Sequence, residues 1–290
     1  VIKSLVDKQI FEEYYINTDR VSFEKEADYE IHLSESQTTV LESIKEKFQQ
    51  FDVNLLHGVT ASGKTEVYIK LIEEFLQQDK QVLFLLPEIA LTTQLVQRLS
   101  AYFGNQIAVF HSKYNSNERV EVYNHVLQNS EKAKVVLGVR SALFLPFLNL
   151  GLIVVDEEHE ATYKQQDPAP RYHARDAAIV LAKFHNAKVL LGSATPSLES
   201  YHNAKTNKYG LIELFTRFNN VVLPEIHLID LKDKYFRKRM DGHFSDELLE
   251  RMHETLANNE QIMLFQNRRG YSPYIECTTC GHVPQCPSCD

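Results

Sequence analysis

The sequence predicts an α/β domain built on a doubly wound parallel sheet, and three observations lead to this prediction. Apolar runs of strand length recur without polar alternation, which is typical of strands buried on both faces. An amphipathic stretch of helix length follows most of these runs. The chain of 290 residues is 43% apolar and 24% charged, so it can bury a sizeable core. We place this domain at residues 34–214 and expect partial domains on both sides of it.

The expected elements alternate along the chain from strand to helix. The strands are expected at Val53–Leu56, Val82–Leu86, Ile107–Phe110, Val135–Leu137, Leu152–Val155 and Val189–Leu191. The helices are expected at Glu66–Gln78, Leu91–Tyr102, Asn117–Gln128 and Ala174–Phe184. Beyond the domain, Ser245 is a good N-cap and predicts a helix over Ser245–Asn258. The apolar run Ile262–Phe265 predicts a further buried strand.

Composition excludes several classes of protein. No window approaches ~18 uninterrupted apolar residues, so we expect no membrane span. The sequence shows no basic leader followed by an apolar run, so we expect no signal peptide. The net charge of −8 argues against nucleic acid bound over the whole surface but allows a local basic groove. All four cysteines lie between Cys277 and Cys289, which favours a metal site in a reducing compartment over disulfides. We therefore expect a cytoplasmic location.

A phosphate-binding loop is predicted between the first strand and the first helix. Gly58–Thr65 fits the pattern G-x-x-x-x-G-K-[ST] in full, in the strand-then-helix context that this pattern requires. The glycines let backbone N–H groups turn toward phosphate oxygens at a helix N-terminus. Lys64 is expected to neutralise the β- and γ-phosphates, and Thr65 to hold Mg²⁺. The predicted ATP-binding residues in the loop are Gly58, Val59, Thr60, Ala61, Ser62, Gly63, Lys64 and Thr65.

An acidic pair follows the apolar run Leu152–Val155 and completes the predicted catalytic set. Strand ends of this kind form the ligand-binding edge of open α/β sheets. Asp156 is expected to reach Mg²⁺, and Glu157 to orient and deprotonate the attacking water. Such pairs often only cap the next helix, but their order after the phosphate loop favours ATP hydrolysis. Lys64, Asp156 and Glu157 are the predicted catalytic residues.

Two C-x-x-C units predict a zinc site. The predicted ligands are Cys277, Cys280, Cys286 and Cys289. Each two-residue gap lets both thiolates face one metal ion. The spacer between the units is short beside the usual zinc-ribbon spacing of ~15–20 residues. One zinc held by all four cysteines, an iron–sulfur cluster and metal-free thiols therefore remain alternatives.

Several short stretches resemble the motifs of superfamily 2 helicases. Asp156-Glu157-Glu158-His159 resembles motif II, and Gly192–Pro196 resembles motif III. Pro87–Thr92 is similar to motif Ia, and Gly138–Ala142 to motif Ib. Each is a weak signal alone, but the motifs occur together and in the family's order.

Longer stretches narrow the resemblance to the primosomal protein N′ (PriA) family of bacterial replication-restart helicases. The similar stretches are Leu56–Tyr68, Asp156–Gln166, Arg171–Asp176 and Asn267–Tyr271, and the resemblance covers roughly residues 30–290. One departure is that Asp167–Pro170 replaces the Gly-Trp found in many members, and this chain has no tryptophan.

The resemblance implies a RecA-like helicase lobe and roles for particular residues. Gln37 lies where the family's adenine-reading glutamine is found. Tyr163 and Tyr172 are candidate platforms for stacking bases, although both could instead pack locally. The residues implied to couple the ATP site to DNA are Thr92, Arg140, His159, Tyr163, Arg171, Tyr172, Ser193 and Thr195.

The resemblance also implies a domain order and partners. Residues 1–33 would end a winged-helix domain and its linker, 215–276 would link to and begin a second helicase lobe, and 277–290 would begin a zinc insertion with two interleaved sites, incomplete here. The implied activity is ATP-dependent 3′ to 5′ unwinding, with ATP, Mg²⁺ and Zn²⁺. The implied partners are single-stranded and forked DNA, single-stranded-DNA-binding protein and other primosome proteins. The implied location is the cytoplasm, in association with the nucleoid.

Two other functions remain open at this point. One is an ATP-switched module that recognises DNA forks without processive unwinding, and the other is a different superfamily 2 DNA translocase. Because most of the implied second lobe lies beyond this sequence, we expect the chain alone to be a nearly inactive ATPase.

Overall fold

The computed structural model describes residues 31–87, 93–111, 115–217, 224–265, 279–280 and 282. The chain divides into two compact units, Val1–Val222 and Leu223–Asp290. The expectation for residues 1–30 lies outside the described residues, and the predicted division into four segments stays a prediction.

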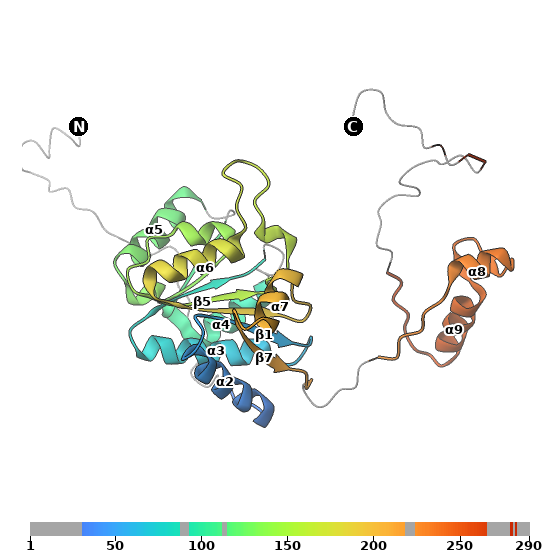
Figure 1. Cartoon of the computed structure of the whole chain (residues 1–290), viewed down its shortest axis with the longest axis horizontal. Helices are drawn as coiled ribbons and strands as arrows, with labels where there is room; N and C mark the ends of the chain where they lie inside the picture. The colour runs from blue at the N-terminus through green and yellow to red at the C-terminus, as the bar shows by residue number, and fades with distance from the viewer. Residues whose placement is uncertain are drawn as a thin grey trace, which may run out of the picture. The chain divides into compact units, whose positions relative to one another are not determined.

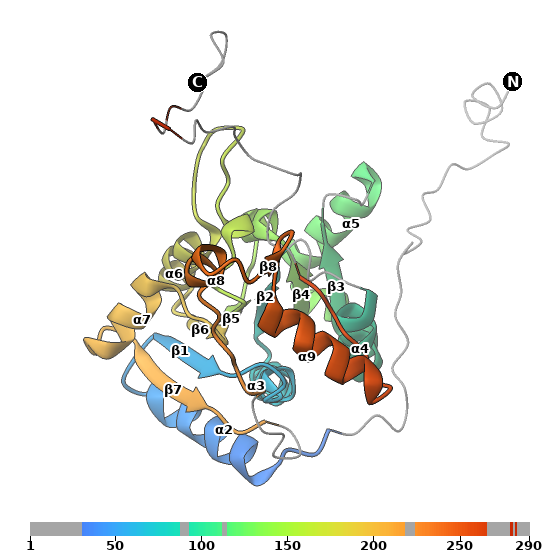
Figure 2. The same ribbon diagram turned by 90° about the vertical axis from the view of Figure 1, so that its right-hand side faces the viewer.

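The first unit is built on a seven-stranded sheet with the order β3-β4-β2-β5-β6-β1-β7, in which all pairings are parallel (Figure 2). The strands are β1 (Val53–Gly58), β2 (Gln81–Leu85), β3 (Ile107–Phe110), β4 (Val135–Gly138), β5 (Leu150–Asp156), β6 (Lys188–Ser193) and β7 (Gly210–Leu214). The predicted parallel sheet and its six expected strands are confirmed. The sequence analysis missed β7, because this edge strand pairs only with β1 and carries the exposed Glu213 within its apolar run.

Helices cover both faces of the sheet (Figure 1). The buried faces of α2 (Glu35–Phe48), α3 (Lys64–Gln77) and α4 (Thr93–Phe103) share one core cluster. On the other face lie α5 (Ser116–Leu127), α6 (Ala174–His185) and α7 (Leu198–Lys205), around a second cluster. The four helices predicted in this domain are confirmed, whereas α2 and α7 were not expected. Within the described residues, no helix is both long and apolar enough to cross a bilayer.

The sheet register brings the predicted motifs together. Gly192 of β6 lies opposite Leu56 of β1 on one side and Asp156 of β5 on the other. Because the three strands are parallel, the loops that follow them leave the same edge of the sheet. The phosphate loop, the acidic pair and the segment after Gly192 therefore become neighbours.

The second unit contains α8 (Leu231–Phe236), the hairpin of β8 (Met240–Asp241) and β9 (Phe244–Ser245), and α9 (Asp246–Ala257). The helix predicted after Ser245 is confirmed, and Ser245 Oγ accepts a hydrogen bond from Leu248 N at 3.2 Å.

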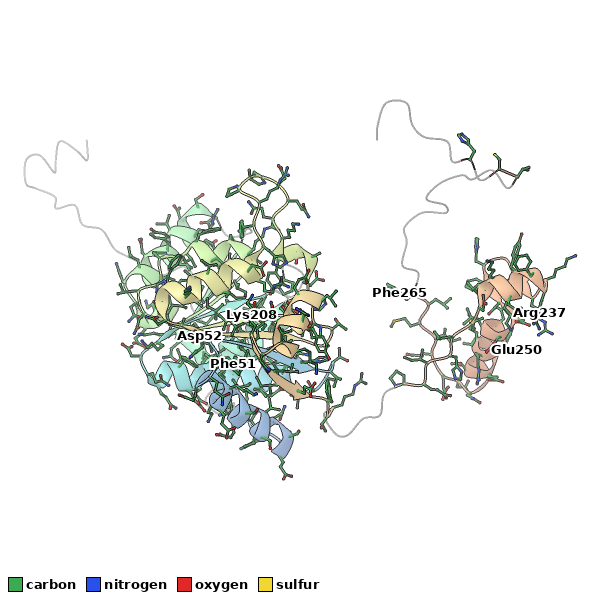
Figure 3. All side chains as sticks on the ribbon, in the orientation of Figure 1. Phe51, Asp52, Lys208, Arg237, Glu250 and Phe265 are labelled. Atoms are coloured by element: carbon green, nitrogen blue, oxygen red, sulfur yellow. The ribbon has the colours of Figure 1, made fainter. Side chains whose placement is uncertain are left out.

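The buried strand predicted at Ile262–Phe265 is wrong. Residues 261–265 have no regular secondary structure, and Met263 and Phe265 are 93% and 86% exposed. Phe265 is labelled in Figure 3. An apolar run forms a buried strand only where neighbouring strands pair with its backbone. The described part of this unit offers only the short pair of β8 and β9.

Candidate functional site

The phosphate loop begins where buried strand β1 ends and closes at the first residue of α3. Ala61 and Gly63 adopt left-handed conformations, with φ of 59° and 80°. Such residues turn the backbone tightly, so that its N–H groups can line a nest for an anion at a helix N-terminus. A Cβ atom at Gly63 would overlap the side-chain amide of Gln37. Position 63 therefore requires glycine both for its backbone conformation and for space.

A cavity of about 580 Å³ lies against this loop. Its walls bring together the phosphate loop, the end of β5 and the segment before α2. The lining residues are Ile31, His32, Gln37, Thr60, Ala61, Ser62, Gly63, Lys64, Thr65, Glu66, Arg98, Asp156 and Glu157. Of the predicted ATP-binding residues, only Gly58 and Val59 do not line it.

Two side chains hold the loop from either side. Lys64 Nζ donates to the carbonyl oxygens of Gly58 at 2.9 Å and Val59 at 3.4 Å, so its charge is held at the loop. The Gln37 side chain is buried, and its Nε2 donates to Gly63 O at 3.2 Å and Ser62 O at 3.5 Å. Its Oε1 accepts from Ser34 N at 2.8 Å. The amide expected to meet adenine thus contacts the phosphate loop and the start of α2.

Asp156 lies at the end of β5 in surroundings that disfavour its charge. Burial, and then the neighbouring Glu157, raise the pKa of Asp156 to about 6. Tyr68, one turn along α3 from Lys64, donates its hydroxyl to Asp156 Oδ1 at 3.0 Å. Tyr68 was missed, although its place four residues after Lys64 put both on one helix face. A Cβ atom at Gly192 would overlap the Tyr68 hydroxyl, so this contact also requires glycine at position 192.

His159 connects the acidic segment to the segment after β6. Its Nδ1 lies 2.8 Å from Ser193 Oγ, and its Nε2 lies 3.3 Å from Thr195 Oγ1. The same ring nitrogen, His159 Nδ1, lies 3.7 Å from Glu157 Oε2. Three residues predicted to couple the sites, His159, Ser193 and Thr195, therefore form one chain of contacts that reaches Glu157.

Glu158 is fully buried and makes a second connection, which the sequence analysis did not predict. Its Oε2 accepts from Arg175 Nη1 at 3.0 Å, Ser197 Oγ at 3.0 Å and Ser200 Oγ at 2.8 Å, and its Oε1 accepts from Ser197 N at 2.7 Å. These contacts anchor Glu158 to the starts of α6 and α7, and so they fix the backbone next to Glu157.

A loop at residues 164–173 projects from the body of the first unit before α6 (Figures 1 and 2). Of the predicted DNA-coupling residues, Tyr172 belongs to this loop, Tyr163 immediately precedes it, and Arg140 is hydrogen-bonded to Tyr172. Arg140 Nη1 donates to Thr162 O at 2.9 Å, and the half-buried Tyr172 donates its hydroxyl to Arg140 O at 3.4 Å. Arg171 is exposed. Thr92 lies outside the described residues.

The proposal of Tyr163 as a base-stacking platform is wrong. Its side chain is buried, with 1% exposure, and its hydroxyl donates to Leu85 O at 3.0 Å and Asp156 O at 2.6 Å. A ring whose hydroxyl finds two carbonyl acceptors in the core offers no open face to a base. Tyr163 instead joins the ends of β2 and β5.

The cysteine prediction falls almost wholly outside the described residues. Cys280 is exposed with a free thiol, whereas Cys277, Cys286 and Cys289 are not described. Among the described residues, no group of three or more His, Cys, Asp or Glu side chains could hold a metal ion. The zinc site stays a prediction.

Comparison with known proteins decides the family. The family model described as DEAD/DEAH box helicase matches residues 34–204, more than half of the chain. The chain belongs to the DEAD/DEAH box helicase family. Within this family the chain is similar to "Replication restart protein PriA" of Bacillus subtilis, with 42% identity over 100% of this chain and 36% of that protein. The proteins of the same name from Haemophilus influenzae and Rickettsia felis are 48% and 46% identical over 83% and 81% of this chain.

The chain thus spans about a third of the length of these relatives. Among solved structures, RecG bound to a three-way DNA junction matches 64% of this chain and 24% of its own, with a TM-score of 0.47 and 20% identity. The DNA-bound helicase MrfA matches 63% of this chain with a TM-score of 0.44 and 18% identity.

Proposed function

We propose that the cavity binds Mg·ATP and that this chain is the ATP-binding part of a 3′ to 5′ DNA helicase motor that acts in replication restart. The observation that carries the proposal is that the phosphate loop, with Lys64, shares one cavity with Asp156 and Glu157. The similarity to PriA proteins over most of the chain supports the assignment to replication restart.

The lining residues fit the parts of Mg·ATP. Lys64 would neutralise the β- and γ-phosphates, and the backbone N–H groups of the loop would cradle them. Glu157 would orient the attacking water and take its proton. Thr65 and Asp156 would hold Mg²⁺, which would neutralise charge on the phosphates. The raised pKa of Asp156 is consistent with this, because burial and Glu157 disfavour its charge and a divalent cation beside it would offset that cost.

Nucleotide binding is tested by titration calorimetry of Mg·ATP against Lys64→Ala. The change removes a charge-assisted contact to phosphate and should weaken binding by ~1.5–3 kcal/mol, about tenfold or more. Lys70→Ala is the matched control, because Lys70 lies on the same helix but is bound to Glu73 and Tyr102. Equal affinities of the wild type and Lys64→Ala would sink the assignment.

DNA, forks and partner proteins belong to the same proposal. Single-stranded and forked DNA would lie across the loops after β4 and β5, near Arg140 and Arg171, and single-stranded-DNA-binding protein and other primosome proteins would act with the whole protein. The rival is an ATP-switched module that recognises forks without unwinding them. A protein of the relatives' full length that displaces a strand only with ATP supports the motor, whereas ATP-dependent fork binding without displacement supports the rival.

Zinc and the cellular location complete the proposal. Paired C-x-x-C units support Zn²⁺ bound by cysteine thiolates, and clustered cysteines without a disulfide pattern support a cytoplasmic location. The proposed DNA binding supports association with the nucleoid. Metal analysis of the purified full-length protein, with all four cysteines changed to serine as the control, tests the zinc assignment.

A further inference from the structure

An exposed aromatic ring lies beside the projecting loop. Phe144 closes the short 3₁₀ helix Arg140–Phe144 that follows β4, and it is 66% exposed. Its ring meets the ring of Tyr172 edge to face, with centroids 5.2 Å apart and planes at 82°. Sequence analysis did not single out Phe144, because nothing in its apolar surroundings distinguishes an exposed ring from a core residue.

Tyr172 holds this ring in place. Its hydroxyl donates to Arg140 O, in the same 3₁₀ helix as Phe144, and its carbonyl oxygen accepts from Gln165 N at 2.9 Å. Lys164 and His173 pair next to it as an isolated antiparallel bridge. Tyr172 is thus hydrogen-bonded both to the 3₁₀ helix and to Gln165 of the projecting loop. Because Tyr172 is held in this way, the Phe144 ring is positioned before any ligand binds, which lowers the entropy cost of binding.

A single exposed aromatic is ordinary on a protein surface, and its setting is what points to a ligand. An edge-to-face pair leaves at least one face of Phe144 outside the contact. Arg140 lies four residues before Phe144, and the exposed Arg171 lies next to Tyr172. An exposed aromatic ring on a segment that also carries arginines fits a nucleotide, because a base can stack on the ring while cations on the same segments meet the flanking phosphates.

We propose that Phe144 is a stacking platform for an unpaired base of single-stranded DNA, with Tyr172 as its positioning residue. The proposal rests on the DNA binding proposed above and deepens it. It assigns to Phe144 the contact expected of Tyr163, whose ring is buried.

The absence of tryptophan from the chain allows a direct test. Phe144→Trp installs a single tryptophan, whose fluorescence a stacked base should quench. Phe184→Trp is the matched control, because Phe184 is 79% exposed on α6. Each variant is titrated at low salt with a labelled thymidine oligonucleotide, and label anisotropy reports binding independently. We expect quenching only at position 144, and none when an abasic oligonucleotide binds.

Affinity supplies the second readout. Phe144→Ala should weaken binding of the oligonucleotide about 5- to 100-fold without changing the salt dependence, because stacking releases no counterions. Binding without quenching at position 144, equal quenching at 184, or unchanged affinity of Phe144→Ala would overturn the stacking site while DNA binding stands. No anisotropy change with the wild-type chain would overturn the DNA interaction itself, and the stacking site with it.

Discussion

Asp156 is a carboxylate whose protonation differs between the folded and the unfolded chain. Its pKa is raised to about 6 in the folded chain from the ordinary aspartate value of 3.8, so between these pH values the folded state keeps a proton that the unfolded state releases. The contribution of Asp156 to the free energy of unfolding therefore falls as pH rises through this window, and it is lost above about pH 6.

Asp156→Asn should abolish the loss of stability that accompanies ionisation of Asp156, while it keeps an oxygen to accept a hydrogen bond from the Tyr68 hydroxyl. Without Mg²⁺ and nucleotide, we expect the variant to be more stable than the wild type at pH 7.5, by up to about 3 kcal/mol, and nearly equal to it at pH 4. Urea denaturation of both proteins at the two pH values measures this. The same stability difference at both would contradict the raised pKa.

The Gln37 side chain could act by holding the phosphate loop or by recognising adenine, and a substitution distinguishes the two roles. The amide contacts the phosphate loop through Gly63 O and Ser62 O. We therefore expect Gln37→Ala to weaken binding of ATP and of inorganic tripolyphosphate by the same factor, about fivefold, because neutral hydrogen bonds contribute ~1 kcal/mol. Gln49→Ala, at the exposed end of α2, serves as the control. Loss of ATP affinity with unchanged tripolyphosphate affinity would instead support adenine recognition by Gln37.

The buried pair of Glu158 and Arg175 joins the segment after β5 to the starts of α6 and α7. Arg175→Met leaves the Glu158 carboxylate buried without its cation, which should lower the free energy of unfolding by ~3–5 kcal/mol. Adding Glu158→Gln should recover much of this loss, since the uncompensated charge disappears. Lys188→Met, which breaks the exposed pair with Asp52 in the same unit, should cost less than ~1 kcal/mol. Additive effects of the two changes at Glu158 and Arg175 in denaturation experiments would show that they do not act as a pair.

The sequence could predict the elements that have a local signal, but few of the contacts between them. Continuous apolar runs next to turn residues located β1 through β6, and the complete loop pattern located Lys64 and Thr65. The partners of Gln37, Glu158 and Tyr68 lie far along the chain, so only the folded sheet brings them together. Tyr163 and Phe144 have similar aromatic side chains, and tertiary packing alone decides that the first is buried and the second exposed.

At the scale of the whole molecule, the proposed ATP site is a cavity lined by residues of one lobe. Lys64, Asp156 and Glu157 share the cavity, and Arg98, which also lines it, is paired with Glu66. In superfamily 2 motors, as the resemblance implies, the opposite wall and its arginine come from a second lobe. Such an arginine raises the rate of phosphoryl transfer by ~10³–10⁵.

We therefore expect the 290-residue chain to bind Mg·ATP but to hydrolyse it slowly, with little stimulation by single-stranded DNA. ATP turnover is measured with and without DNA, beside a protein of the relatives' full length, which is about three times longer than this chain. Lys64→Ala is the control, because it removes the cation of the phosphate loop, so any turnover that it retains does not come from this site. Comparable, DNA-stimulated rates in the two proteins would mean that residues 1–290 hold the whole hydrolytic machinery. The two-lobe mechanism would then be wrong, because one sheet would supply both walls of the site.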